Sequence, residues 1–176
     1  FEPTVVGTWD GEEAHVFSKA DVEIEGVTVH PLHPRAVGEH LEKHINAGGV
    51  ILGHNIRGFD LPVLNAALDC KTAGDLMGKS ESVIDTKLLV DKAALVGDKV
   101  HTTLETLVRS TLDVGKSMKS EDAPNAWRAG RYHDVIKYCI KDCQLTYDLY
   151  MYGKENGIVK SRKLSDGSII DIEVEW

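Results

Sequence analysis

The segment over residues 50–68 constrains the fold of this chain more than any other part. Its first four residues, Val50-Ile51-Leu52-Gly53, form a short apolar run of the kind found in buried central strands. Asp60-Leu61-Pro62 then predicts the start of a helix over 60–68, with aspartate at the cap and proline in the first turn. A strand that passes through a short turn into a helix is a building unit of α/β proteins. We therefore expect an α/β fold.

The rest of the chain fits the same class. Apolar spacing predicts a hairpin over 4–17, a loop with a short strand over 21–34, a strand over 83–86 and a C-terminal hairpin over 160–176. It predicts helices over 36–47, 86–95 and 132–154, and another that begins near residue 102. Because the first hairpin is antiparallel, we expect a mixed central sheet flanked by helices. The length suits one domain over residues 1–176.

Charge and cysteine content limit the function. The chain has 28 acidic and 20 basic side chains, which gives a formal net charge of −8. This balance argues against broad electrostatic capture of nucleic acid, although an enzyme that meets phosphates through bound cations remains compatible with it. The three cysteines, Cys70, Cys139 and Cys143, are a poor disulfide framework. We expect them to be core residues in a reducing compartment, because a zinc site on Cys139 and Cys143 would need two further ligands.

The ends and the hydropathy of the chain bear on its location. The sequence has no long uncharged apolar run, so we expect no membrane helix. Its first residues lack the basic and then apolar pattern of a signal peptide. We expect a cytoplasmic protein.

Two segments carry side chains suited to chemistry. Asp60 follows the end of a predicted strand, where open α/β sheets bind ligands, although capping of its own helix would also explain it. Tyr138 and Asp142 are four residues apart, so both project from one helix face. A surface pair on an amphipathic helix is the alternative interpretation of these two residues.

Taken together, the two segments resemble a known enzyme family. Asn55-x-x-x-Phe59-Asp60 and Tyr138-x-x-x-Asp142 are similar to the second and third conserved segments of the tyrosine subclass of DEDD 3′–5′ exonucleases, which have the ribonuclease H-like fold. Ile84-Asp85-Thr86 and the segment over 101–107 also fit. The chain looks closest to exonuclease domains related to bacterial helicase-associated proteins, and more distantly to those of phage replicative polymerases. Shared features of that group are Gly115-Lys116-Ser117, Trp127 before Gly130-Arg131, the segment over 152–157 and Val174-Glu175-Trp176.

The resemblance implies a bacterial or phage enzyme that removes nucleotides from the 3′ end of single-stranded DNA, in association with a helicase or a polymerase. It implies two Mg²⁺ or Mn²⁺ ions about 4 Å apart on the scissile phosphate. Asp60 and Asp142 would be oxygen ligands of these ions. Tyr138 would orient the attacking water, because a phenol with a pKa of about 10 is a poor base.

Other residues are expected to meet the substrate. The candidates are Asn55, Arg57, Phe59 and Lys116, of which Lys116 is equally well explained as a solvated lysine. Asp85 either approaches the metal site or caps its own helix, and His54 is expected to be structural. Degradation of RNA instead of DNA stays open, because the contacts to the 2′-hydroxyl that would decide it are not visible in the sequence.

The first segment of the family, an Asp-x-Glu on the first strand, is not evident. Asp10-Gly11-Glu12 lies in a predicted turn, and Asp21-Val22-Glu23 lies in a predicted loop. Asp171-Ile172-Glu173 has the flanks of a strand but would need a permuted arrangement. We expect the true pair, with the first strand, to precede Phe1. A protein that lacks this pair is instead expected to be a catalytically incomplete module that binds nucleic acid or a partner protein.

Overall fold

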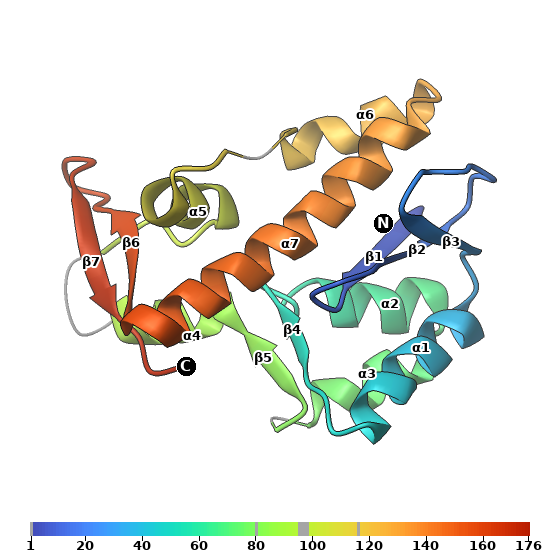
Figure 1. The fold of residues 1–176 in the computed structure, drawn as a ribbon, viewed down its shortest axis with the longest axis horizontal. Coiled ribbons are helices and arrows are strands. Elements are labelled where there is room, and N and C mark those ends of the chain that lie inside the picture. The colour runs from blue at the N-terminus through green and yellow to red at the C-terminus, as the bar shows by residue number, and fades with distance from the viewer. Residues whose placement is uncertain (1, 80, 95–98, 116) are drawn as a thin grey trace.

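The computed structural model describes residues 2–79, 81–94, 99–115 and 117–176. Strands come first along the chain, strands and helices are then mixed, and a hairpin ends it (Figure 1). In order they are β1 (Val5–Trp9), β2 (Ala14–Ser18), β3 (Val27–Pro31), α1 (Pro34–Asn46), β4 (Ile51–Gly53), α2 (Asp60–Leu68), α3 (Lys71–Met77), β5 (Val83–Asp85), α4 (Thr86–Ala94), α5 (Leu104–Leu112), η1 (Ser120–Asp122), α6 (Ala123–Arg128), α7 (Tyr132–Asn156), β6 (Ile158–Arg162) and β7 (Ile169–Glu173).

The described strands lie in three small sheets instead of one central sheet. Strand β1 pairs antiparallel with β2, and β2 pairs parallel with β3, so the first sheet is mixed as predicted. Strands β4 and β5 pair in parallel, with Gly53 opposite Asp85. Strands β6 and β7 form the predicted C-terminal hairpin. The α/β class is confirmed, whereas the prediction of a single sheet is wrong for the strands that the structure describes.

Two local expectations are corrected where the chain passes from β4 to α2. All three residues of β4 are only partly buried, so this strand is not the fully buried central strand that its composition predicts. Helix α2 begins at Asp60, and its N-cap residue is Phe59. Asp60 is therefore the first residue inside the helix and not its cap. Capping does not explain the presence of an aspartate at this position.

Helix α7 runs across the molecule and joins its two ends (Figure 1). Its first half packs on β1 and β2 through Ile136 and Ile140. Its second half packs on α5 and the C-terminal hairpin through Leu145 and Leu149. A third apolar cluster lies among α1, α2, α3 and the strands beside them. No helix in the described ranges is long and apolar enough to cross a membrane.

The cysteines contribute to this packing as predicted. Cys70 is buried in the cluster beneath α1. Cys143 donates from its thiol to the carbonyl of Gly7, at 3.4 Å. A Cβ atom added at Gly7 would lie 2.8 Å from Sγ of Cys139, so β1 runs directly against α7. All three cysteines are free thiols.

The last turns of α7 supply a test of the packing. A Cβ atom at Gly153 would lie 2.6 Å from the ring of Trp176, which stacks on Tyr150 at a centroid distance of 5.5 Å. We expect Gly153→Ala to lower the free energy of unfolding by about 1–3 kcal/mol, because the ring must move. Chemical denaturation measures this loss. In the control Gly78→Ala, the nearest non-neighbouring atom is 3.7 Å away, so an equal loss there would contradict the steric explanation.

Candidate functional site

The candidate site lies where the parallel strands β4 and β5 end. The turn over residues 54–59 follows β4 and leads into α2, and α4 follows β5 directly. Asn55 begins the turn with a left-handed backbone, φ 64°, which asparagine adopts more readily than most residues. The carbonyl of Asn55 accepts hydrogen bonds from the backbone N–H groups of Gly58 and Phe59, at 3.1 and 2.9 Å. The turn therefore directs the chain straight into the helix that Asp60 begins.

Asp85 holds this turn in place. Its carboxylate accepts hydrogen bonds from the backbone N–H groups of Asn55 at 2.8 Å and Arg57 at 3.0 Å. It also accepts from Lys87 at 3.1 Å and Leu88 at 3.4 Å in the first turn of α4. The prediction that Asp85 caps its helix is confirmed. The sequence did not indicate that the same carboxylate also anchors the turn before Asp60.

Loss of this anchor is expected to destabilise the protein. In Asp85→Asn, an amide N–H₂ group replaces one oxygen and faces backbone donors that then lack an acceptor. Asp85 is only 4% exposed, so water cannot easily replace the lost bonds, and we expect a loss of about 2–4 kcal/mol in the free energy of unfolding. Denaturant titration measures it. The exposed Asp75→Asn is the matched control, expected to change stability by less than about 0.5 kcal/mol. Similar stability of the two variants would contradict the anchoring role.

Two other carboxylates, those of Asp85 and Asp142, act on Asp60. Although Asp60 as a residue is exposed, its carboxyl lies among enough protein atoms to lose part of its hydration. This loss raises the pKa of Asp60 to about 6, and the negative charges of Asp85 and Asp142 act in the same direction. Asp60 and Asp142, which are far apart in the sequence, are thus close enough in the fold to interact. Their approach is what the site hypothesis requires.

Helix α7 carries the other two residues of the candidate site, Tyr138 and Asp142. Tyr138 is 8% exposed, and its hydroxyl lies 2.7 Å from the hydroxyl of Ser120 in η1. Asp142 is partly buried one turn further along. Cys143 follows Asp142 in the helix. A hydrogen bond with Cys139 and burial raise the pKa of the Cys143 thiol, and the negative charges of Asp142 and Asp60 raise it further. This thiol therefore stays protonated and forms part of the packing between α7 and β1.

The four predicted substrate contacts have different environments. Phe59 is 46% exposed directly before Asp60. The guanidinium of Arg57 donates to the backbone carbonyls of Met77 at 2.9 Å, Lys79 at 2.9 Å and Val83 at 3.2 Å. Arg57 therefore ties the turn to the end of α3 and the start of β5. Asn55 shapes the turn through its backbone, and Lys116 lies outside the described residues.

His54 at the start of the turn is structural, as predicted. One ring nitrogen lies 2.9 Å from the hydroxyl of Thr86, and the other lies 2.9 Å from the carbonyl of Thr102. The imidazole thus links the end of β4 to the start of α4 and to the residues before α5.

The three Asp-x-Glu triplets occupy the kinds of places that the sequence predicts. Asp10 accepts from the backbone N–H groups of Glu12 and Glu13 in the turn between β1 and β2, at 2.9 and 2.8 Å. Asp21 and Glu23 lie outside strands and helices before β3. Asp171 and Glu173 are exposed on β7, in the C-terminal hairpin, which lies at the end of the molecule away from α2 (Figure 1).

The donor atoms at the site suit a hard divalent cation only in part. Asp60 and Asp142 offer carboxylate oxygens of the type that Mg²⁺ and Mn²⁺ prefer, and the mutual repulsion felt by Asp60 is what a cation would relieve. The oxygens of Asp85 are occupied by backbone donors. In the described ranges, no three His, Cys, Asp or Glu side chains come together closely enough to hold a metal ion. Two carboxylates fit one cation incompletely, and a two-ion site needs further ligands.

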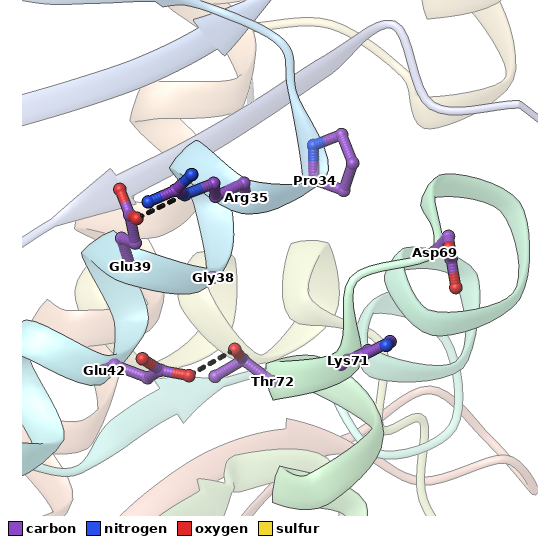
Figure 2. A pocket seen from close by; sticks show the side chains of 8 residues that line it. All are labelled: Pro34, Arg35, Gly38, Glu39, Glu42, Asp69, Lys71 and Thr72. Carbon is purple, nitrogen blue, oxygen red and sulfur yellow. Dashed lines mark hydrogen bonds and ion pairs between the residues drawn. The ribbon is translucent and has the colours of Figure 1, made fainter.

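A hollow elsewhere on the surface is a less suitable site. A cleft of about 370 Å³ lies between α1 and the start of α3 (Figure 2). Two of its acidic side chains have partners within the cleft, Glu39 with Arg35 at 2.7 Å and Glu42 with the hydroxyl of Thr72 at 2.7 Å. A Cβ atom at Gly38 would lie 2.8 Å from the Thr72 hydroxyl, so the walls are already in close contact. Asp60, Tyr138 and Asp142 do not line this cleft.

Sequence reasoning missed Ser120. It sits in a polar stretch without apolar periodicity, and no spacing signal connects it to Tyr138. Comparison with models of known protein families and with curated proteins found no match.

Proposed function

We propose that this chain is the ribonuclease H-like domain of a metal-dependent 3′–5′ exonuclease that acts on single-stranded DNA. The observation that carries the proposal is the approach of Asp60 to Asp142. Burial is the main cause that raises the pKa of Asp60, and the negative charges of Asp85 and Asp142 add to the rise. Two negative charges held together at the end of parallel strands are costly unless a cation or a proton compensates them. The burial of Tyr138 one turn before Asp142 supports the same assignment.

Each residue of the site has its own role in the proposed reaction. Asp60 and Asp142 would hold a cation, which when bound would lower the pKa of water and neutralise charge on the scissile phosphate. Tyr138 orients the water that attacks phosphorus. The bond from phosphorus to the 3′-oxygen of the preceding nucleotide breaks, and a nucleoside 5′-monophosphate leaves. The proton of the water passes to solvent, and the 3′-oxygen left on the DNA takes up a proton from solvent to become a hydroxyl. Asp85 keeps the turn before Asp60 in position.

The proposal also accounts for the divided sheet. In the described ranges, β1 pairs with β2 alone and β4 pairs with β5 alone, while α7 packs against both β1 and β4. A further strand between β1 and β4 would join two sheets into one and would lie beside the candidate site. Such a strand is where an Asp-x-Glu would supply the ligands that Asp60 and Asp142 do not.

The full natural chain tests the proposal. A single-stranded DNA oligonucleotide labelled at its 5′ end is incubated with Mg²⁺, Mn²⁺ or EDTA. We expect stepwise shortening from the 3′ end with either cation and none with EDTA, and a phosphorothioate bond at the 3′ end should block it. An RNA oligonucleotide of the same sequence decides the preference for sugar. Intact DNA in every arm would refute the exonuclease proposal.

One observation favours a second candidate, a non-catalytic module of the same fold. In the described part of the chain no three ligating side chains gather closely enough for a metal ion, and the Asp-x-Glu triplets lie outside the site. Such a module would bind nucleic acid or a partner protein without cleaving it. Fluorescence anisotropy with labelled single-stranded DNA in Mg²⁺ distinguishes the two, because stable binding to an uncut oligonucleotide supports the module alone.

A further inference from the structure

The hydroxyl of Tyr138 lies against a residue from another segment. Ser120 Oγ and Tyr138 Oη are 2.7 Å apart, a normal length for a hydrogen bond between hydroxyl groups. Tyr138 is 8% exposed, so protein surrounds most of its ring, whereas Ser120 is exposed. The contact therefore occurs where the buried ring of Tyr138 approaches the surface.

The segment that carries Ser120 is fixed on the same helix as Tyr138. Ser120 begins η1, which Asp122 closes by donating from its backbone N–H to the carbonyl of Lys119 at 3.0 Å. Helix α6 follows directly and packs on α7, and its Ala126 is fully buried. The rings of Trp127 and Tyr132 lie 4.7 Å apart and add to this contact. Because α6 is docked on α7, the position of Ser120 relative to Tyr138 is set by packing and not by one hydrogen bond.

The chemistry of two hydroxyl groups gives this contact a consequence. A phenol carries one O–H proton, which rotates about the C–O bond toward the best acceptor. A fixed neighbour that donates to or accepts from the phenol oxygen selects one direction for that proton. A group that orients water must present its proton and its lone pairs in constant directions, because misplacement by about 1 Å is costly in rate.

We propose that Ser120 is a positioning residue for Tyr138, whose hydroxyl it fixes for the orientation of the attacking water. The inference rests on the proposed exonuclease activity. Ser120 itself does not touch the reacting atoms and acts through the phenol. The segment between α5 and α6 thus contributes to catalysis through a residue that carries no charge and binds no metal.

A double-mutant cycle tests the inference on the full natural chain. Ser120→Ala is expected to lower kcat about three- to tenfold with KM unchanged, the range expected for one hydrogen bond between neutral groups. Tyr138→Phe is expected to lower kcat by at least as much. The double variant is expected to be no slower than Tyr138→Phe alone, because Ser120 has no phenol oxygen left to act on. Ser120→Thr keeps the hydroxyl and is expected to retain wild-type kcat.

Two outcomes of the kinetic experiment would contradict the inference. Losses in kcat that multiply in the double variant would mean that Ser120 acts independently of the phenol. An unchanged or higher kcat in Ser120→Ala would mean that the contact does not position the hydroxyl of Tyr138. If the wild type degrades neither DNA nor RNA, the proposed function fails by itself. The contact is then judged from the unfolding equilibrium constants of the same four proteins. A coupling of threefold or more between the effects of the two substitutions on unfolding supports the contact between Ser120 and Tyr138, and additive effects overturn it.

Discussion

The Asp142→Asn variant of the full natural chain is expected to release nucleotides from a DNA 3′ end about 10³-fold more slowly than the wild type. Asparagine keeps the shape of the side chain but loses the negative charge that would hold a divalent cation. A thousandfold loss corresponds to about 4 kcal/mol, within the several kcal/mol that a bound metal contributes to charge stabilisation. Measurement of mononucleotide release in Mg²⁺ at saturating DNA gives the rate.

Folding is not expected to suffer in the same variant. The neutral amide that replaces the Asp142 carboxylate no longer repels the charge of Asp60, so the metal-free protein is expected to be as stable as the wild type or more so. Stabilisation by added Mg²⁺ or Mn²⁺, seen as a rise in Tm, is expected to diminish. Asp148→Asn, an exposed change on the same helix, is the control and is expected to keep full activity. Comparable activity of Asp142→Asn and the control would remove Asp142 from the site.

Acidification is expected to destabilise the packing of α1 on the first sheet by about 2 kcal/mol through His40. Burial, and the positive charges of His44, His15, His30 and Lys43, lower the pKa of His40 to about 4 from an ordinary 6.5. The ring centroid of His40 lies 4.9 Å from that of His15 and 4.8 Å from that of His44. Nε2 of His40 lies 2.9 Å from the hydroxyl oxygen of Thr8. Asp10 and Glu13, near His15, offset part of the repulsion.

The direction of the effect follows from linkage. The folded protein binds a proton at His40 less readily than the unfolded chain, so the stabilising contribution is complete above about pH 6.5 and is lost as pH falls toward 4. The full shift in the pKa of His40 would correspond to a loss of about 3 kcal/mol in the free energy of unfolding. Solvent around the half-buried ring reduces this loss to about 2 kcal/mol. Urea titrations at pH 7.5 and pH 4.5 measure the loss. His40→Gln is expected to remove most of it, whereas the exposed His101→Gln is not; equal pH dependence in both variants would contradict this account.

Local patterns in the sequence predicted much of the fold, and their failures have physical causes. Helices α2 and α4 lie almost where the sequence places them, because Asp60-Leu61-Pro62 marks the start of α2 and the strand over 83–86 leads directly into α4. Helices α3 and α6 were missed because they have only seven and six residues, too few to establish a period. The prediction that β4 is a buried central strand was wrong because an apolar run does not show which strands or helices cover it.

The candidate site was predicted from residue types but not from their surroundings. The spacing of Tyr138 and Asp142 placed them on one helix face, and the structure adds that Asp60 reaches the same region. Composition did not show that the guanidinium of Arg57 binds backbone carbonyls, or that Asp85 serves two segments at once. Such roles depend on long-range geometry, since Asp85 and Asn55 meet only because their strands are paired.

Helix α7 contributes residues to two of the three apolar clusters, through Ile136 and Ile140 at one end and Leu145 and Leu149 at the other. A continuous helix cannot detach from one cluster without straining its hold on the other, so the two are coupled into one cooperative unit. Tyr138 and Asp142 lie at the middle of that unit, away from the ends where helices fray. The residues proposed to act on the substrate therefore occupy a backbone that opens only when most of the molecule opens.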